Sequence, residues 1–548
     1  MDFSKKRILI YLIIIGLISL GFKLYFVNFS VPLIGDEMNF ALRGIAYSNG
    51  DFAVNAKQNP GWPLFIAPFL LLIDSDDFID YSNVVRVLSM SITTITILPT
   101  YLLGRKFFDQ KYSLVAASLF AFEPHLNRWS TFGYSEPLYI LVMVLSFYLI
   151  LNKNDKYAFI SFFLAAILWW VRLNGIVMFV VLSIIFFVNF KGRPNLTKKY
   201  LGCIAIFLIA VSPILIQRYV QYDDPFYLYY SENLFVDEYS QLGIHDEIND
   251  DATVGGYIEH YGFLQFFQRF IILGIYNVLE GIARIAFPYL IILLPFGLIF
   301  SLRAFAQDSK YTRANWILII VTLASMVVPY ALIPEKRLLF FIYPFLIIFA
   351  TIPIQRVTEY GLSTFSFTTK QKNVFLVIII ATVILLSLLF SLRYEIIDTI
   401  KEQEKMVFTK FLINNIDGGL LEAGYNTQYL IHQSLNNPPG AFKNFKIDRD
   451  PQPYIGWPYD QANSLLVKSY GKSLEELLYN GEGYGLKYIA INEEKISFFE
   501  YLEDVYKHEE KYPYLIKVFD SDEYGFQKFK VKIFEIDYNR FHKEKRPL

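Results

Sequence analysis

The chain has 548 residues, 54% of them hydrophobic and 18% charged, with a formal net charge of −1 at pH 7. A soluble domain carries about 25% charged residues and a nucleic-acid-binding protein needs a basic stripe. The composition therefore excludes an ordinary soluble protein and gives no sign of a nucleic-acid partner. The single cysteine, Cys203, excludes a disulfide framework.

Long runs without Asp, Glu, Lys or Arg predict membrane spans, because a spanning helix needs about 20 mostly apolar residues. The first run follows Lys5-Lys6-Arg7 and shows neither the short apolar core nor the cleavage site of a signal peptide. We therefore expect it to remain as an uncleaved span. In chain order the predicted spans are 8–28, 84–104, 111–127, 137–152, 157–171, 173–190, 200–218, 284–302, 314–334, 338–355 and 373–392.

The distribution of Lys and Arg predicts the orientation, because short loops rich in these residues stay in the cytoplasm. Basic residues recur at every second loop between the predicted spans. This alternation predicts about eleven transmembrane helices in the plasma membrane, with a cytoplasmic N-terminus. The span at 111–127 is the weakest, because Glu123 and Pro124 shorten its apolar run, but its removal would break the alternation.

Residues 1–392 thus form a predicted polytopic α-helical membrane domain with two long outer loops, 29–83 and 219–283. After Leu392 the composition changes abruptly, and residues 393–548 predict a small extracytoplasmic α/β domain. In it we expect an amphipathic helix at 402–415 and a buried strand at 488–491. A hairpin is expected from the strands 514–519 and 526–536.

Acidic residues near the outer membrane surface are functional candidates, because ionisable side chains are costly at membrane depth. Asp36 and Glu37 come a few residues after the first predicted span and are preceded by Gly35. Their ordinary interpretation is a solvated loop start. Glu136, at the start of the fourth predicted span, is a further candidate.

Basic residues on the outer side oppose the positive-inside trend. Lys336 and Arg337 lie in a short turn between two apolar runs. They either pair with Glu335 or reach toward lipid headgroups, or they form a phosphate clamp, since Arg offers a planar fork and Lys a point charge. Arg172 either marks the turn between two spans or adds positive charge to the same site.

Other chemistries find little support in the sequence. The six histidines are scattered without metal-ligand spacing, and there is no Gly-rich phosphate loop or nucleophile elbow. Paired halves, which would be expected in many transporters, are not recognisable.

Several short motifs occur in an order that resembles the GT-C glycosyltransferases, above all the protein O-mannosyltransferase and lipid A aminoarabinose transferase group. The resemblance covers about residues 1–360. The motifs are Asp36-Glu37, Asn59-Pro60-Gly61-Trp62-Pro63-Leu64, Arg86, Ala121-Phe122-Glu123-Pro124, Tyr134-Ser135-Glu136-Pro137-Leu138-Tyr139, Val171-Arg172-Leu173-Asn174-Gly175 and Lys336-Arg337-Leu338-Leu339.

The resemblance implies a sugar donor carried on a polyprenyl or dolichyl phosphate and a first-loop carboxylate as catalytic base. It therefore makes Asp36 the base, with Glu37 orienting a substrate. Arg337, Lys336, Arg172 and Arg86 become candidates for holding the donor phosphate, and Glu136 and Lys57 become candidates for binding substrate. Sugar transfer needs a carboxylate to accept the acceptor proton and cations to stabilise the departing phosphate.

The sequence departs from the group in two places that bear on subfamily and acceptor. Asn59 and Trp62 stand where many relatives have His and Pro, and Leu173 stands where they have Pro. Three alternatives stay open: an oligosaccharyltransferase-like enzyme that requires a divalent metal, a lipid or sugar transporter without covalent chemistry, and a non-catalytic scaffold. The main interpretation requires no cofactor and leaves dependence on a divalent metal open. The acceptor is a protein, a lipid or a glycan.

Overall fold

The computed structural model describes residues 4–52, 58–227, 235, 253–306, 310–394, 398–423, 442, 445–446, 465–467, 469, 471–493 and 501–544. The chain divides into two compact units. The first comprises Met1–Val27, Val54–Ile66 and Val85–Tyr394, and the second comprises Asn28–Ala53, Ala67–Val84 and Glu395–Leu548. Two segments of the predicted outer loop 29–83 thus group with the C-terminal residues. The predicted domain boundary at 392 stays a prediction.

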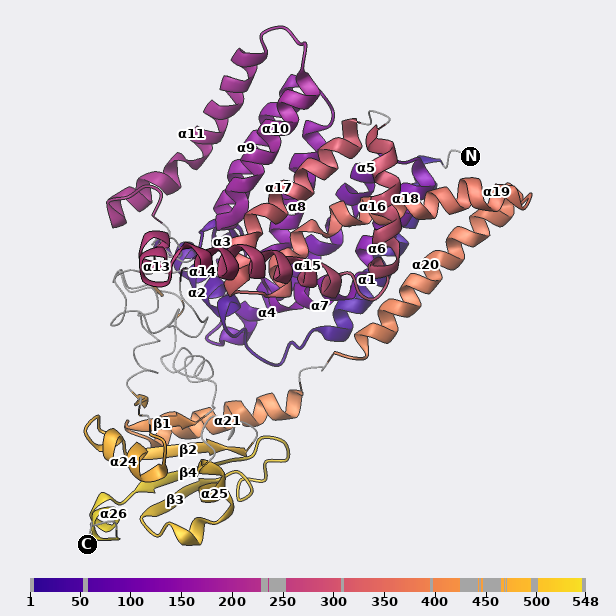
Figure 1. Ribbon diagram of the computed structural model, residues 1–548. Helices are drawn as coiled ribbons and strands as arrows, with labels where there is room; N and C mark the ends of the chain where they lie inside the picture. The colour runs from indigo at the N-terminus through magenta and orange to yellow at the C-terminus, as the bar shows by residue number, and fades with distance from the viewer. Residues whose placement is uncertain are drawn as a thin grey trace. The chain divides into compact units, whose positions relative to one another are not determined.

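The first unit is a bundle of helices (Figure 1). Its N-terminal half contains α1 Lys5–Phe26, α4 Phe78–Ile95, α5 Ile97–Gly104, α6 Gln110–Ala121, α7 Pro124–Trp129, η1 Ser130–Phe132, α8 Glu136–Ile150, α9 Asp155–Val171, η2 Leu173–Gly175, α10 Ile176–Phe190 and α11 Leu196–Tyr222. The short helix α3, Gly61–Leu70, and the start of α4 belong partly to the second unit.

The second half of the bundle begins with a series of short helices. It contains α13 Val254–Tyr261, α14 Phe263–Phe266, η4 Phe267–Ile272, α15 Leu273–Ile285, α16 Leu290–Ala306, α17 Lys310–Leu332, η5 Lys336–Ile342, α18 Tyr343–Arg356, η6 Val357–Gly361, α19 Leu362–Thr364 and α20 Thr369–Ser391. The predicted span at 284–302 starts later than expected. Pro288 lies in the break between α15 and α16, where it has no N–H to continue a helix.

In the described part of the chain, eight helices are long and apolar enough to cross a membrane. This confirms the predicted fold class, a polytopic helical membrane protein with a small C-terminal sheet. The weak span at 111–127 corresponds to α6, which ends at Ala121. There the Glu123 carboxylate caps α7 and Pro124 occupies its first turn. The number of eleven spans and the orientation stay predictions.

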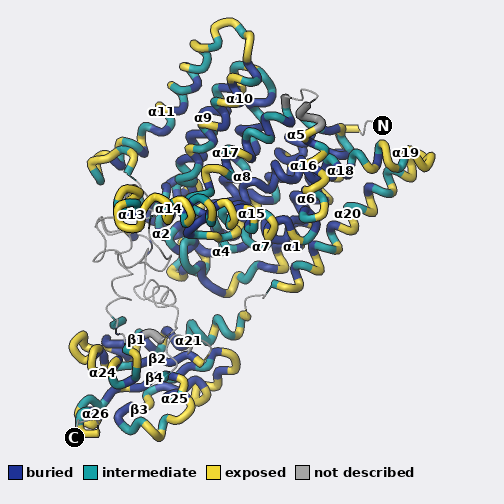
Figure 2. Tube along the Cα trace, viewed as in Figure 1, coloured by how far each residue is buried: buried dark blue, intermediate teal, exposed yellow. Residues whose placement is uncertain are grey.

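The core of the bundle lies around α18. In the most apolar part of Lys336–Thr364, 83% of the residues are buried, whereas in Thr369–Ser391 only 22% are. Gly297 allows α16 to approach α18 closely, because a Cβ there would lie 2.2 Å from the Phe349 carbonyl oxygen. The exposed residues along α11 and α20 (Figure 2) include apolar side chains that we expect lipid to cover.

The series α13–α15 replaces part of the predicted outer loop 219–283. Although it extends over more than 20 residues, its contacts with α17 fall on the last turns of that helix. Gly274 meets Val327, Asn277 meets Tyr330, and Arg269 meets Ala331. The series therefore lies across the end of α17 rather than alongside it, as Figure 1 shows.

The second unit contains a four-stranded sheet in the order β1-β2-β4-β3. The strands are β1 Leu420–Ala423, β2 Tyr488–Asn492, β3 Leu515–Asp520 and β4 Val531–Ile536, and the helices are α2 Asp36–Ser48, α21 Thr399–Asn415, α24 Leu474–Glu482, α25 Tyr501–Lys507 and α26 Tyr538–Glu544. The pair β1–β2 is parallel and the other two pairs are antiparallel. The helix, the strand and the hairpin expected from the sequence are all present.

The second strand of the hairpin begins at Val531, five residues later than predicted. The Glu404 carboxylate of α21 accepts hydrogen bonds from the backbone N–H groups of Gln527, Lys528 and Phe529, at 2.5–2.9 Å. These three donors point to the helix and are not used in the strand ladder. Burial alone would raise the pKa of Glu404, but these backbone hydrogen bonds outweigh it and lower the pKa.

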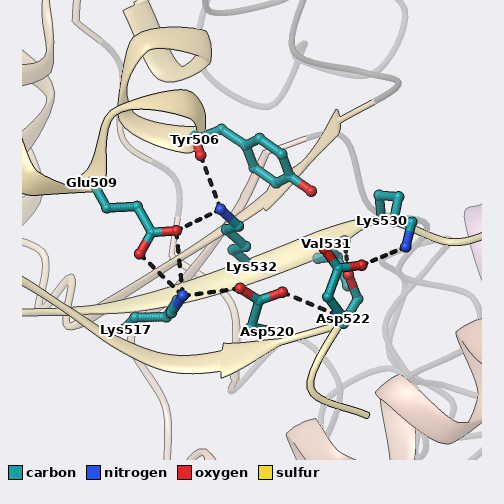
Figure 3. A network of polar contacts seen from close by, with 9 residues as sticks. Tyr506, Glu509, Lys517, Asp520, Asp522, Lys530, Val531 and Lys532 are labelled. Atoms are coloured by element: carbon teal, nitrogen blue, oxygen red, sulfur yellow. Dashed lines mark hydrogen bonds and ion pairs between the residues drawn. The ribbon is translucent and has the colours of Figure 1, made fainter. Parts of the chain in front are cut away.

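A network of ion pairs lies along the hairpin formed by β3 and β4 (Figure 3). Lys517 bridges Glu509 and Asp520, at 3.2 and 2.9 Å, and Lys532 reaches Glu509 and the Tyr506 carbonyl oxygen. The network ties the loop before β3 to both strands of the hairpin.

Candidate functional site

Three turns of the first unit lie at the same end of its helices: the turn before α8, the turn between α9 and α10, and the turn between α17 and η5. A short connection joins α8 and α9 at their other ends, so the start of α8 lies beside the end of α9. In addition, α8 contacts η5 and α10 contacts α17. These turns carry Glu136, Arg172 and Arg337.

Glu136 and Arg172 form an ion pair. Arg172 Nη1 lies 2.7 Å from Glu136 Oε1, and the same nitrogen donates to Ser135 Oγ at 3.3 Å. The N–H groups of Arg172 do not point at the carboxylate well enough for a hydrogen bond, so the contact with Glu136 is electrostatic. The carboxylate is buried in the first turn of α8, where the helix dipole also favours negative charge.

Arg337 lies in the first turn of η5. Its Nε bonds the Glu335 carboxylate, and its guanidinium carbon lies 4.9 Å from the centre of the Tyr134 ring. The ion pair with Glu335 is one of the two interpretations considered for this turn. Tyr134 stands two residues before Glu136, so Arg337 contacts the segment that leads to Glu136.

Glu136 and Arg337 line one small pocket. The other lining residues are hydroxyl, aromatic and aliphatic: Thr93, Thr96, Phe120, Leu126, Trp129, Ser130, Tyr134, Pro137, Ile140 and Phe340. The pocket thus combines a carboxylate and a guanidinium with four aromatic rings, those of Phe120, Trp129, Tyr134 and Phe340.

The remaining candidate residues of the first unit are less closely grouped than Glu136, Arg172 and Arg337. Lys336 is exposed beside Arg337. Arg86 is buried in α4, about two turns before Thr93. Lys57 lies outside the described residues.

The Asn59–Trp62 turn contacts the other motifs of the first unit. Asn59 Nδ2 donates to the Trp169 carbonyl, and Trp62 Nε1 donates to the Gly133 carbonyl at 3.0 Å. A Cβ at Gly61 would lie 2.5 Å from the Trp170 carbonyl carbon, so only glycine permits this approach. The turn thereby fixes the ends of α9 and η1, next to Arg172 and Tyr134.

Sequence reasoning missed two buried cations in the first unit. Arg218, near the end of α11, donates from Nη2 to Asn59 Oδ1 at 2.6 Å. Lys23 of α1 donates to Ser19 Oγ and Asn127 Oδ1, at 2.7 and 2.8 Å. Both cations follow long apolar runs. A cation directly after such a run is the sequence feature that could have identified them.

A second buried polar group supports α7. His125 Nδ1 lies 2.9 Å from the Glu123 carboxylate and 3.2 Å from the Tyr343 hydroxyl, which donates to the Ile285 carbonyl. The Glu123 carboxylate also accepts from the Leu126 N–H, at 2.7 Å. These contacts hold the segment that leads to Trp129 and the pocket.

Asp36 and Glu37 belong to the second unit, where they begin α2. Gly35 precedes them with a φ of 73°, a conformation that favours glycine, and Glu37 is buried. The Leu33 N–H donates to Ser82 Oγ at 3.1 Å and so fixes the chain just before the pair. Carboxylates in a first helical turn are stabilised by the helix dipole.

Comparison with known proteins shows which proteins this architecture resembles. The family model for dolichyl-phosphate-mannose-protein mannosyltransferases matches residues 57–217. No curated protein sequence matches the chain significantly.

Two solved structures share the fold. One is the archaeal oligosaccharyltransferase AglB from Archaeoglobus fulgidus in complex with an inhibitory peptide and a dolichol-phosphate, at 14% identity and a TM-score of 0.55, covering 89% of this chain and 69% of AglB. The other is ArnT from Cupriavidus metallidurans in the apo state, at 10% identity and a TM-score of 0.50, covering 96% and 98%. Together with the family model, they confirm the resemblance found in the sequence motifs.

Proposed function

We propose that this protein is a glycosyltransferase that moves a sugar, a hexose or a pentose, from a polyprenyl- or dolichyl-phosphate donor to an acceptor hydroxyl at the outer membrane face. The observation that carries the proposal is the group formed by Glu136, Arg172 and Arg337 at one end of the helices. The donor class is supported by the matching family description and by AglB, whose structure contains a dolichol-phosphate.

The cations suit the leaving group of this reaction. As the bond between the sugar C1 and the phosphate oxygen breaks, its electron pair passes to the phosphate. Arg337 and Lys336 stabilise that negative charge. Arg172, in the same group of turns, adds to this stabilisation. Arg86 is a further candidate for the donor. Glu136 offers a carboxylate to the sugar hydroxyls beside Tyr134 and Trp129.

The acceptor needs a base. Its hydroxyl oxygen forms the new bond to C1, and its proton passes to the Asp36 carboxylate, while Glu37 orients a substrate. Lys57 is proposed as a substrate-binding residue. Direct displacement inverts the configuration at C1, so a product with retained configuration would contradict this mechanism.

The test is transfer of radiolabelled sugar from synthetic polyprenyl-phosphate donors by the purified full chain, with Asp36→Asn beside the unchanged protein. We expect donor consumption by the unchanged protein, and a loss of at least about a hundredfold in the variant, as for removal of a general base. Binding of a fluorescent polyprenyl phosphate to both proteins should be equal. Normal turnover in Asp36→Asn would remove Asp36 from this role.

An oligosaccharyltransferase-like activity is the second candidate, because AglB shares the fold. It predicts transfer of a whole glycan to an asparagine side chain and loss of activity on chelation of divalent metal. If no donor in a broad panel is consumed and a glycolipid instead moves between leaflets, the transporter interpretation replaces both.

A further inference from the structure

The series α14–α15, which comprises Phe263–Ile285, has three different faces. One face is buried and contains two glycines, Gly274 and Gly281. A second face carries the polar side chains Arg269, Asn277, Glu280 and Arg284. The third is apolar and exposed, with Ile272, Ile275, Tyr276 and Leu279. Phe263–Ile285 is one of the eight described segments long and apolar enough to cross a membrane. Its three faces and its position across the end of the bundle nevertheless suit the interface between lipid and water.

The glycine face brings α15 unusually close to the end of α17 and to η5. A Cβ at Gly274 would lie 2.2 Å from the Val327 carbonyl oxygen. A Cβ at Gly281 would lie 2.7 Å from the Tyr330 hydroxyl and 2.8 Å from Leu339. The position of α15 and that of the Tyr330 hydroxyl are therefore coupled by direct contact.

Hydrogen bonds continue from this contact to Arg337. Asn277 Nδ2 donates to the Tyr330 carbonyl at 3.1 Å, and the Tyr330 hydroxyl donates to the Glu335 carbonyl at 2.9 Å. The Glu335 carboxylate in turn bonds Arg337 Nε. Tyr330 is itself fully buried, so its hydroxyl fixes the main chain of the turn that carries the cation.

We propose that α15 holds the Arg337 turn in its phosphate-binding position, with Tyr330 and Asn277 as positioning residues for the donor. This rests on the proposed function. Tyr330 acts on the donor only through Glu335 and Arg337. Its removal should therefore weaken binding of the donor phosphate while leaving the acceptor and the proton transfer unchanged.

The variant Tyr330→Phe removes only the hydroxyl, and Tyr276→Phe in α15 is its matched control, since Tyr276 is 61% exposed. We expect Tyr330→Phe to raise the Kd for a fluorescent polyprenyl phosphate, and the donor KM, about two- to tenfold, as for one neutral hydrogen bond. The kcat should change less than about twofold, and the control should match the unchanged protein.

A second pair of variants tests the contact itself. In Gly281→Ala the new methyl group displaces the Tyr330 hydroxyl, so the same loss of affinity is expected. The control Gly255→Ala, in α13, has only an ordinary neighbour, Thr253 Oγ1 at 3.9 Å.

The combination with Arg337→Gln separates the two proposals. If Tyr330 acts through Arg337, then adding Tyr330→Phe to Arg337→Gln causes no further loss, whereas independent effects would multiply. If Arg337→Gln itself binds the probe normally, the phosphate role in the proposed function is wrong. If Arg337→Gln loses affinity but Tyr330→Phe and Gly281→Ala do not, only the positioning role is wrong.

Discussion

Arg172 Nη1 lies 2.7 Å from Glu136 Oε1, although the two residues stand in different turns of the chain. Arg172 follows the last residue of α9, and Glu136 is the first residue of α8. The pair therefore ties together two helices that are connected only at their other ends. It also gives the buried carboxylate a cationic partner at the pocket that Arg337 shares.

Loss of one partner should cost more than loss of both. Arg172→Gln leaves the Glu136 carboxylate buried without its cation, and we expect the free energy of unfolding to fall by about 2–3 kcal/mol. This is below the roughly 3–5 kcal/mol for a fully buried pair, because the Arg172 side chain is 22% exposed. The double variant Arg172→Gln with Glu136→Gln should regain much of this stability but not the transfer activity. Thermal unfolding in detergent and turnover measure the two effects, and equal stability of the single and double variants would contradict the pairing.

The geometry of the cation at position 337 should matter more than its charge. Arg337 contacts both Glu335 and the Tyr134 ring, and Lys cannot reproduce the planar fork. We expect Arg337→Lys to raise the donor KM about tenfold, which corresponds to roughly 1.4 kcal/mol. Lys336→Gln, at the exposed neighbouring position, should raise it less than about threefold, and only at low salt. Steady-state kinetics at two salt concentrations make the comparison, and a larger effect at Lys336 would reverse the assignment.

Gly61 should tolerate no side chain. The Cβ of Gly61→Ala would lie 2.5 Å from the Trp170 carbonyl group, where both neighbours are main chain and cannot turn away. We expect a loss of about 1–3 kcal/mol, as for other overpacked sites, together with reduced turnover, since the same turn adjoins Arg172. Gly21→Ala in α1 is the control, because nothing lies within 4 Å of its Cβ. Comparable thermal midpoints for the two variants would show that the close approach of Gly61 to the end of α9 does not limit stability.

The sequence predicts well whatever depends on local composition. Apolar runs placed the helices, and the turn at Arg172 was expected because a lone charge interrupts such a run. The motifs also named Glu136, Arg172 and Arg337, which the structure brings together in one group. Their grouping was implied by the resemblance, but the individual contacts were not.

Long-range contacts could not be derived in this way. Nothing local marks Tyr134 as the ring beside Arg337, or Asn59 as the partner of Arg218, which is 159 positions away. The late start of β4 has the same origin, because Glu404 captures the N–H groups of residues 527–529 from a distant helix. The series α13–α15 was missed because its polar and apolar residues read together as a loop.

The ion-pair network of the hairpin should make the C-terminal sheet sensitive to acid (Figure 3). Burial alone would raise the pKa values of Glu509 and Asp520. Hydrogen bonds from Lys532 and Lys517 to Glu509, and from Lys517 and the Asp522 N–H to Asp520, outweigh it. Both pKa values therefore lie below the ordinary 4.5 and 3.8.

A carboxylate whose pKa is lowered by folding contributes stability above its unfolded pKa and loses it as the pH falls through the folded value. Stability should thus be constant near pH 7, begin to fall as the pH approaches 4.5, and fall further below 3.8. Hydrogen–deuterium exchange of residues 515–536 in the full chain, corrected for the intrinsic effect of pH, measures this. Lys517→Met should lower protection at pH 7 and flatten its acid dependence, because the ionised form of Asp520 then contributes less to stability. Lys543→Met, at an exposed position in α26, should behave as the unchanged protein. An acid dependence that is the same in all three proteins would show that the network does not control it.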